Sequence, residues 1–160
     1  MHKVEPDRYH YSECGLDNIY LISGFDFVST PRGKSVRITN VEGLHRAIGL
    51  MIVKEKNKLT GKEFRFLRHE LNQTQSDLAA ILGVGVQSVA RWEKGRTKEI
   101  EGSAQRLLRA IYRQYVEGVQ DIVKPLKELA RLDEISHDIE DEEFGFQPKN
   151  GWQLSLSTEA

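Results

Sequence analysis

The chain has 160 residues, of which 39% are hydrophobic and 29% are charged, and its formal net charge at pH 7 is −1. The single cysteine, Cys14, excludes an intramolecular disulfide, and no stretch approaches the ~18 uninterrupted apolar residues of a membrane-spanning helix. We therefore expect a cytoplasmic globular protein that does not bind a membrane.

The near-neutral net charge conceals three regions of different sign. Residues 1–57 hold 8 Lys and Arg against 7 Asp and Glu, residues 58–116 hold 11 against 6, and residues 117–160 hold 4 against 11. A basic middle region suits a polyanion such as nucleic acid, whereas the acidic end would be repelled by one.

Residues 1–57 are predicted to form a small β-rich domain. The segment 18–28, NIYLISGFDFV, is rich in β-branched and aromatic residues, and Thr30–Gly33 has the composition of a turn before the alternating segment 34–39. Two or three antiparallel strands are therefore expected. Asn40 can then cap a helix whose apolar face carries Leu44, Ile48 and Met51.

Helices are predicted through most of residues 58–118. Thr60 and Glu63 have the spacing of a capping box, and apolar residues follow at i, i+3 and i+7 from Phe64. An amphipathic helix is expected from Ser103 to about residue 116. Another is expected over about 119–135, with a kink or a new start at Pro125. The sequence beyond residue 136 shows no clear period.

The segment 74–96 meets the positional demands of a helix-turn-helix. With Gln75 as the first helical residue, Ala79 provides the small side chain that two closely crossing helices need, and Gly83 tolerates the positive φ of a tight turn. We expect the second helix over Val86–Lys94. The apolar residues that would bury it against the first helix are Leu78, Leu82, Val84, Val89 and Trp92.

The stretch from Leu59 to about Tyr115 resembles the Xre type of helix-turn-helix domain, which phage Cro and CI repressors share. The similarity rests on TQSDLAAILGV, on VARWEKG and on the amphipathic helix that follows. In that family the second helix of the motif enters the major groove of DNA. The resemblance therefore implies that base edges are contacted by Val86, Gln87, Ser88 and Arg91. Glutamine can bind adenine bidentately, arginine can bind guanine, and valine can contact a thymine methyl group.

Contacts to the DNA backbone are expected around this helix. Gln75 matches a position that grips a phosphate in the family, and positive charge would be added by Arg68, Lys94, Arg96 and Lys98. We predict no catalytic residue, metal ligand or cofactor. The five histidines form no array with a serine or cysteine, and no glycine-rich phosphate loop is present.

The order of a small β-rich unit before an Xre-type domain resembles the MqsA type of antitoxin. Those proteins join an N-terminal zinc ribbon to a DNA-binding domain and repress their own toxin–antitoxin operon. Residues 11–15, YSECG, resemble a C-x-x-C-G half-site with tyrosine in place of the first cysteine, and the second cysteine pair is absent. Because a structural zinc ion needs four ligands, we expect a degenerate ribbon held by its own packing.

These features predict an α+β protein. It has a β-β-α domain at 1–57, an all-α five-helix domain of the helix-turn-helix type at 58–118, and a C-terminal helix with an acidic tail at 119–160. The functional hypothesis is a homodimeric transcriptional regulator, a repressor, that binds a palindromic operator in double-stranded DNA and is thereby associated with the nucleoid.

Three alternatives remain open. The first is a type II antitoxin that neutralises a toxin protein and autoregulates its operon. In that case the aromatic residues of the acidic tail dock on a basic partner, although they could equally fold back on the protein itself. The second is a small-molecule sensor in the N-terminal unit, and the third is an enzyme with an accessory DNA-binding domain.

Overall fold

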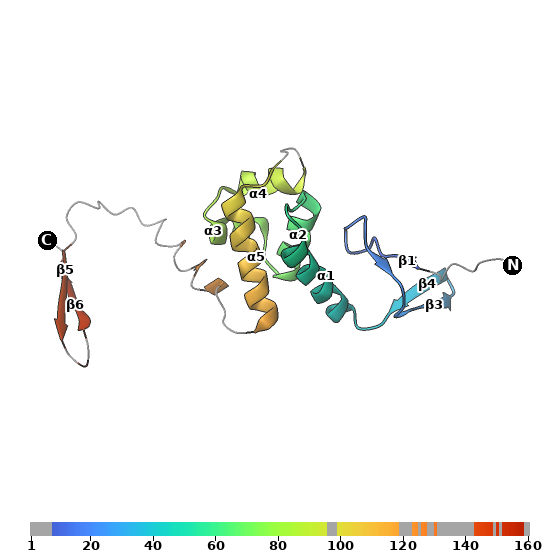
Figure 1. Ribbon diagram of the computed structural model, residues 1–160, viewed down its shortest axis with the longest axis horizontal. Coiled ribbons are helices and arrows are strands. Elements are labelled where there is room, and N and C mark those ends of the chain that lie inside the picture. The colour runs from blue at the N-terminus through green and yellow to red at the C-terminus, as the bar shows by residue number, and fades with distance from the viewer. Residues whose placement is uncertain are drawn as a thin grey trace. The chain divides into compact units, whose positions relative to one another are not determined.

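The computed structural model describes residues 8–95, 99–118, 123–124, 126–127, 130, 143–148, 150 and 152–158 (Figure 1). They fall into two units, one that reaches to Ala130 and one that begins at Arg131, and each is described by itself. Within the described residues, two antiparallel β-ladders precede five helices in the first unit. The predicted α+β class is confirmed.

Four short strands form two separate ladders in the N-terminal region. β1 (Tyr9–His10) pairs with β2 (Tyr20–Leu21), and β3 (Phe25–Thr30) pairs with β4 (Gly33–Ile38). The β3–β4 hairpin closes with Thr30 opposite Gly33, whose φ of 119° favours glycine. The strands predicted within residues 18–39 and the predicted turn at Thr30–Gly33 are confirmed, whereas β1 was not predicted.

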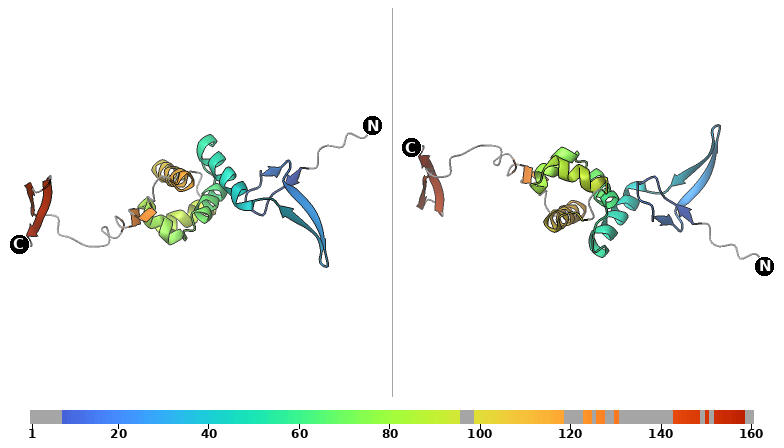
Figure 2. Two further views of the ribbon diagram at one scale, coloured as in Figure 1. Left: turned by 90° about the horizontal axis from the view of Figure 1, so that it is seen from below. Right: turned by 90° about the horizontal axis from the view of Figure 1, so that it is seen from above.

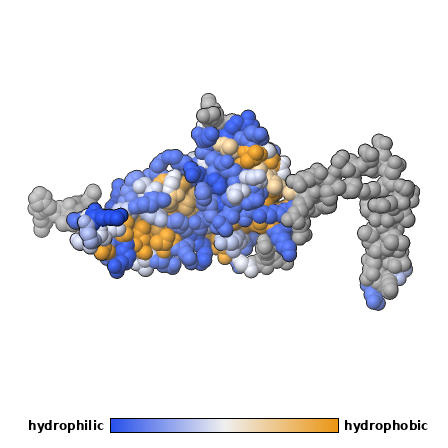
Figure 3. Space-filling model, turned by 180° about the vertical axis from the view of Figure 1, so that it is seen from behind, coloured by the Kyte–Doolittle hydropathy of each residue, from blue (hydrophilic) through white to orange (hydrophobic). Residues whose placement is uncertain are grey.

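The N-terminal strands are stabilised by packing on the helices. Leu16 and Leu21 are buried in the same apolar core as Ile52 of α1 (Val41–Glu55). By contrast, Ile22 and Phe27 are 79% and 60% exposed, and Figure 3 shows apolar surface on this part of the molecule. Because a two-stranded hairpin is only marginally stable alone, the burial against the helices is what holds this region in place.

A chain of three polar side chains fixes the N-terminal region to the first two helices. The hydroxyl of Tyr11 lies 2.7 Å from Nε2 of His45, and Nδ1 of His45 lies 2.9 Å from a carboxylate oxygen of Glu70. The carboxylate can only accept, so Nδ1 of a neutral His45 carries the hydrogen and Nε2 accepts from the tyrosine. The segment that contains Tyr11 is thereby tied to α1 and α2.

The first two helices begin with the predicted caps. Asn40 accepts from the backbone N–H of Gly43 at 3.1 Å and starts α1. Thr60 and Glu63 form a reciprocal capping box at the start of α2 (Gly61–Glu70), with distances of 3.2 Å and 2.9 Å between the paired nitrogen and oxygen atoms. Each cap satisfies N–H groups that have no acceptor within the helix.

The remaining helices of this unit are α3 (Gln75–Leu82), α4 (Val86–Glu93) and α5 (Gly102–Glu117). α5 packs beside α1 (Figure 2), and Tyr112 of α5 is fully buried where Gly49 of α1 leaves room for it. Burial raises the pKa of Tyr112 to about 12, so its hydroxyl stays protonated. Arg109 of α5 donates to the carbonyl groups of Ile52 and Val53 in the last turn of α1, and to that of Asn57 just after the helix.

The second unit contains a hairpin that the sequence analysis did not predict. β5 (Glu143–Pro148) pairs with β6 (Trp152–Thr158), with a register shift between Gly145 and Phe146. Asn150 in the connection has a φ of 51°, a conformation that asparagine tolerates better than most residues. The helix expected over 119–135 lies largely outside the described residues, as does the acidic run before β5.

Gly49 provides a test of the packing between α1 and α5. A methyl group at this position would overlap the Tyr112 hydroxyl, whereas nothing lies within 4 Å of the equivalent position at Gly102. We expect Gly49→Ala to lower the free energy of unfolding by about 1–3 kcal/mol through overpacking. Urea unfolding followed by circular dichroism measures this quantity.

Gly102→Ala is the matched control, and it should leave stability unchanged or raise it by up to about 1 kcal/mol, because alanine favours helix. Equal stability of the Gly49→Ala variant and the wild type would contradict the tight contact.

Candidate nucleic-acid interface

α3 and α4 form a helix-turn-helix whose turn depends on Gly83. The residue has a φ of 71°, in the left-handed region, and ends α3. The N–H of the next residue, Val84, donates to the carbonyl of Ala79 at 3.0 Å. Because of this backbone reversal, only three residues separate the end of α3 from the start of α4. The predicted role of Gly83 is confirmed.

The start of α3 is fixed by a second capping box. The N–H of Asp77 donates to the Thr74 hydroxyl at 3.0 Å, and the N–H of Thr74 donates to the Asp77 carboxylate at 3.3 Å. Hydrogen bonding from Thr74 lowers the pKa of Asp77, so the carboxylate form makes the cap. Gln75 follows directly as the first residue of the helix.

One face of α4 is buried and sets the orientation of the helix. Val89 is fully buried and Trp92 is 8% exposed, and the ring of Trp92 meets that of Phe64 edge to face at 5.7 Å. Leu78 and Ala79 of α3 are buried as well. A methyl group on Gly61 would overlap the carbonyl of Trp92, so α2 begins in close contact with the end of α4. Rotation of α4 would break these contacts.

The opposite face of α4 is exposed and carries the predicted base-contacting residues. Val86, Gln87 and Arg91 are exposed, and Ser88 is half-buried. Gln87 and Arg91 are four residues apart and therefore lie on one side of the helix. Arg91 Nη2 lies 3.4 Å from the Ser88 hydroxyl, which leaves most of its guanidinium donors available. Exposed amide and guanidinium groups on a fixed helix can make bidentate contacts to base edges.

A buried ion pair connects α2 to the end of α4. The guanidinium of Arg68 donates from Nη2 to Glu93 at 2.7 Å and from Nε at 3.0 Å, and the two side chains are 9% and 4% exposed. Arg68 also donates from Nη1 to the carbonyl of Gln73 at 3.0 Å. Gln75 Nε2 contributes a longer contact to Glu93 at 3.3 Å. The pair therefore holds α2, α3 and α4 together.

This arrangement was not predicted from the sequence. Arg68 was expected to contact a DNA phosphate, and in the structure its guanidinium is committed to Glu93 and Gln73. A signal was available, because Arg68 lies four residues after Phe64 and beside Leu67, within the buried stripe of α2. An arginine in such a stripe requires a buried carboxylate.

Of the other predicted phosphate-contacting residues, two lie within the described part of the chain and two lie outside it. Gln75 at the start of α3 is partly exposed, and Lys94, which ends α4, is exposed. Arg96 and Lys98 lie outside the described residues.

The described residues contain no cluster of three or more His, Cys, Asp or Glu side chains arranged to hold a metal ion. The thiol of Cys14 instead donates a hydrogen bond to the carbonyl of Tyr11, with 3.4 Å between sulfur and oxygen. In the described part of the chain, no helix is long and apolar enough to cross a membrane.

Residues 64–101 match the helix-turn-helix family model, which describes the Xre and Cro/CI type of domain. The match covers α2 from Phe64 onward, α3, α4 and the segment that leads to α5. It supports a DNA-binding transcription regulator, and this family is generally not enzymatic. No curated protein and no solved structure matches the chain.

The buried pair between Arg68 and Glu93 predicts a large difference between two Glu→Gln substitutions. Glu93→Gln leaves the charge of Arg68 buried without a counter-charge, and we expect the free energy of unfolding to fall by about 3 kcal/mol or more. Glu99→Gln breaks an exposed pair with Lys58 and should change stability little, since water and salt screen that pair. Urea unfolding of both variants tests this difference, and equally small losses would contradict it.

Proposed function

We propose that this protein, with its Xre-type helix-turn-helix at residues 64–101, is a sequence-specific transcriptional repressor that binds a palindromic operator as a homodimer. The observation that carries the proposal is the division of α4 into two faces. Val89 and Trp92 lock one face into the core, and Gln87 and Arg91 stand exposed on the other. A helix that is held so firmly and presents such side chains is suited to direct readout in the major groove.

In this proposal Gln87 and Arg91 bind base edges, Val86 contacts a thymine methyl group and Ser88 supports the arginine. Gln75 and Lys94 contact phosphates, and Arg96 and Lys98 are proposed to add charge beside them. Arg68 acts mainly by holding Glu93, and thereby places Gln75 and the end of α4.

Dimerisation is proposed to use the C-terminal part of α5. Tyr115 is 60% exposed there, next to a recess of about 300 Å³ whose lining includes Val41, Tyr112 and Val116. Two recognition helices related by a two-fold axis would then enter successive major grooves, roughly 34 Å apart. An operator bound in this way is palindromic, and its occupation excludes polymerase from the promoter.

Gel-shift titration against the DNA upstream of the gene tests the proposal. We expect the wild type to bind tightly in the presence of competitor DNA. Gln87→Ala/Arg91→Ala should weaken specific binding by about 2–6 kcal/mol, the sum of two bidentate base contacts. Arg32→Ala on the β3–β4 hairpin removes the same charge from an exposed position and is the matched control.

A specific complex that the double substitution leaves unchanged would contradict readout by α4. Weak binding that depends steeply on salt for all variants would leave only non-specific attraction between a basic surface and DNA.

A second candidate function, antitoxin activity, is favoured by the separate C-terminal unit. Residues 131–160 carry 2 Lys and Arg against 8 Asp and Glu, and they include the β5–β6 hairpin, which belongs to a different unit from the helix-turn-helix. An acidic segment of this kind suits a basic protein partner.

Deleting residues 131–160 separates the two functions. We expect operator binding, measured by gel shift, to persist. We expect neutralisation of the toxin that a neighbouring gene would encode, measured in a growth assay, to be lost. Neutralisation that survives the deletion would contradict a role for this segment.

A further inference from the structure

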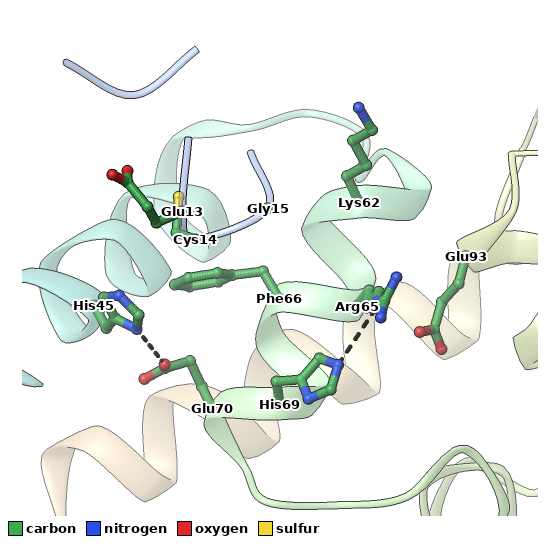
Figure 4. Close-up of a pocket in the computed structure, with 10 residues that line it drawn as sticks. All are labelled: Glu13, Cys14, Gly15, His45, Lys62, Arg65, Phe66, His69, Glu70 and Glu93. Carbon is green, nitrogen blue, oxygen red and sulfur yellow. Dashed lines mark hydrogen bonds and ion pairs between the residues drawn. The ribbon is translucent and has the colours of Figure 1, made fainter. Parts of the chain in front are cut away.

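A cavity of about 490 Å³ lies over α2, between the N-terminal region and the end of α4 (Figure 4). Lys62, Arg65, Phe66 and His69 line it from α2, and Glu13–Gly15 lie on the side of the N-terminal region. Its volume falls within the range of pockets that hold small molecules. The cavity also reaches the end of the helix that carries the predicted base-contacting residues, because Glu93 of α4 lines it.

The carboxylates around this cavity already have partners. Glu70 is bound to His45, Glu93 is bound to Arg68, and Glu13 accepts a hydrogen bond from the hydroxyl of Tyr9. The hydrogen bond from Tyr9 lowers the pKa of Glu13, so this carboxylate is ionised and its charge is shared with that donor. The charge of Glu93 is thus balanced by Arg68, whereas Glu13, whose partner is a neutral hydroxyl, keeps its negative charge on the side of the N-terminal region.

The donors of α2 have capacity left. Arg65 uses Nε to donate to Nε2 of His69 at 3.3 Å, and neither of its terminal guanidinium nitrogens has an acceptor within the described residues. No described carboxylate lies within ion-pair distance of Arg65. Lys62 is held by Asp17 at 2.6 Å, but both side chains are largely exposed and that pair is weak.

His69 is a second available donor. Its Nε2 accepts from Arg65, so Nδ1 of the neutral ring carries the hydrogen. Burial, followed by the charges of Arg68 and Arg65, lowers the pKa of His69. The positive charges of Arg65 and Arg68 beside His69 attract an anionic group to this end of the cavity. The ring of Phe66, which is 5% exposed, forms an apolar part of the wall beside these donors.

We propose that this cavity binds a small organic anion, a carboxylate or phosphate monoester with an apolar body. The anionic group is held by Arg65 and His69 with support from Lys62, and the apolar body lies toward Phe66 and Cys14. Because Glu93 lines the cavity and contacts Arg68 and Gln75, the bound anion acts on the residues that place α3 and α4. It also neutralises positive charge close to the DNA-binding face, so it weakens operator affinity.

Binding is tested without DNA, by NMR titration of the ¹⁵N-labelled full chain with phenyl phosphate. Inorganic phosphate and phenol serve as probes for the two halves of the ligand. We expect saturable shifts at residues 13–15 and 62–70, and tighter binding of phenyl phosphate than of either half. Arg65→Gln should weaken binding by about tenfold or more, as expected for a lost charge-assisted hydrogen bond.

Arg32→Gln is the matched control, and it should leave the affinity unchanged. His69→Gln is a second test at the site, and it should weaken binding in a chain whose spectrum stays folded. Shifts that do not saturate, or an affinity that Arg65→Gln and His69→Gln leave unchanged, would overturn the site. Shifts centred on α4 and lost with Arg91→Gln would overturn it too, because the anion would then occupy the DNA-binding face.

The effect on DNA rests on the proposed function, whereas binding of the probe does not. At constant ionic strength, saturating phenyl phosphate should weaken operator binding by about fivefold or more in the wild type, and should not do so in Arg65→Gln. Unchanged operator affinity with the site filled would overturn the coupling. A protein that binds the probe but no operator would instead contradict the proposed function.

Discussion

The buried pair between Arg68 and Glu93 is the interaction on which the rest of the helix-turn-helix depends. Two charges withdrawn from water are tolerated only where each meets the other with good geometry and the remaining donors are satisfied. Here Glu93 accepts from two guanidinium nitrogens of Arg68, and the Gln73 carbonyl takes a third. Since these residues belong to α2, the α2–α3 connection and α4, the pair permits only one arrangement of the three segments.

α2 is the element that joins the two halves of the first unit. Arg68 and Phe64 face the helix-turn-helix, where they meet Glu93 and Trp92. Glu70 and Phe66 face α1, where both contact His45, and His45 in turn contacts Tyr11 of the N-terminal region. Because α2 is packed on both sides, a displacement of its contacts on one side moves the whole helix as a rigid body and so reaches the contacts on the other side. The N-terminal region is therefore mechanically part of the DNA-binding unit, although it contributes none of the residues expected to touch DNA.

The features that could be predicted from the sequence are those set by short-range interactions. Thr60 with Glu63 and the left-handed Gly83 are fixed by residues within five positions of one another, and both were found as expected. The pair between Arg68 and Glu93 spans 25 positions, and the sequence alone does not state which carboxylate an arginine meets. The contact of Tyr11 with His45 spans 34 positions and was missed for the same reason.

The β5–β6 hairpin was missed for a different reason. Its register shifts between Gly145 and Phe146, and such an irregularity interrupts the strict alternation by which a strand is recognised. For the candidate site, the location of Gln87 and Arg91 on one exposed side of α4 followed from helical spacing. Their contact with DNA stays a prediction, because it depends on a partner whose sequence is unknown.

The two ends of α4 are held very differently. No side chain caps its N-terminus at Gly85, whereas its C-terminal turn is secured by Trp92 and Glu93. An uncapped first turn frays more readily than a capped one, so the residual freedom of the helix is concentrated at Val86 and Gln87. These positions can adapt to small differences in groove width without strain in the core. The same freedom is lost on binding, and this entropic penalty makes affinity depend on how well the DNA orders that turn.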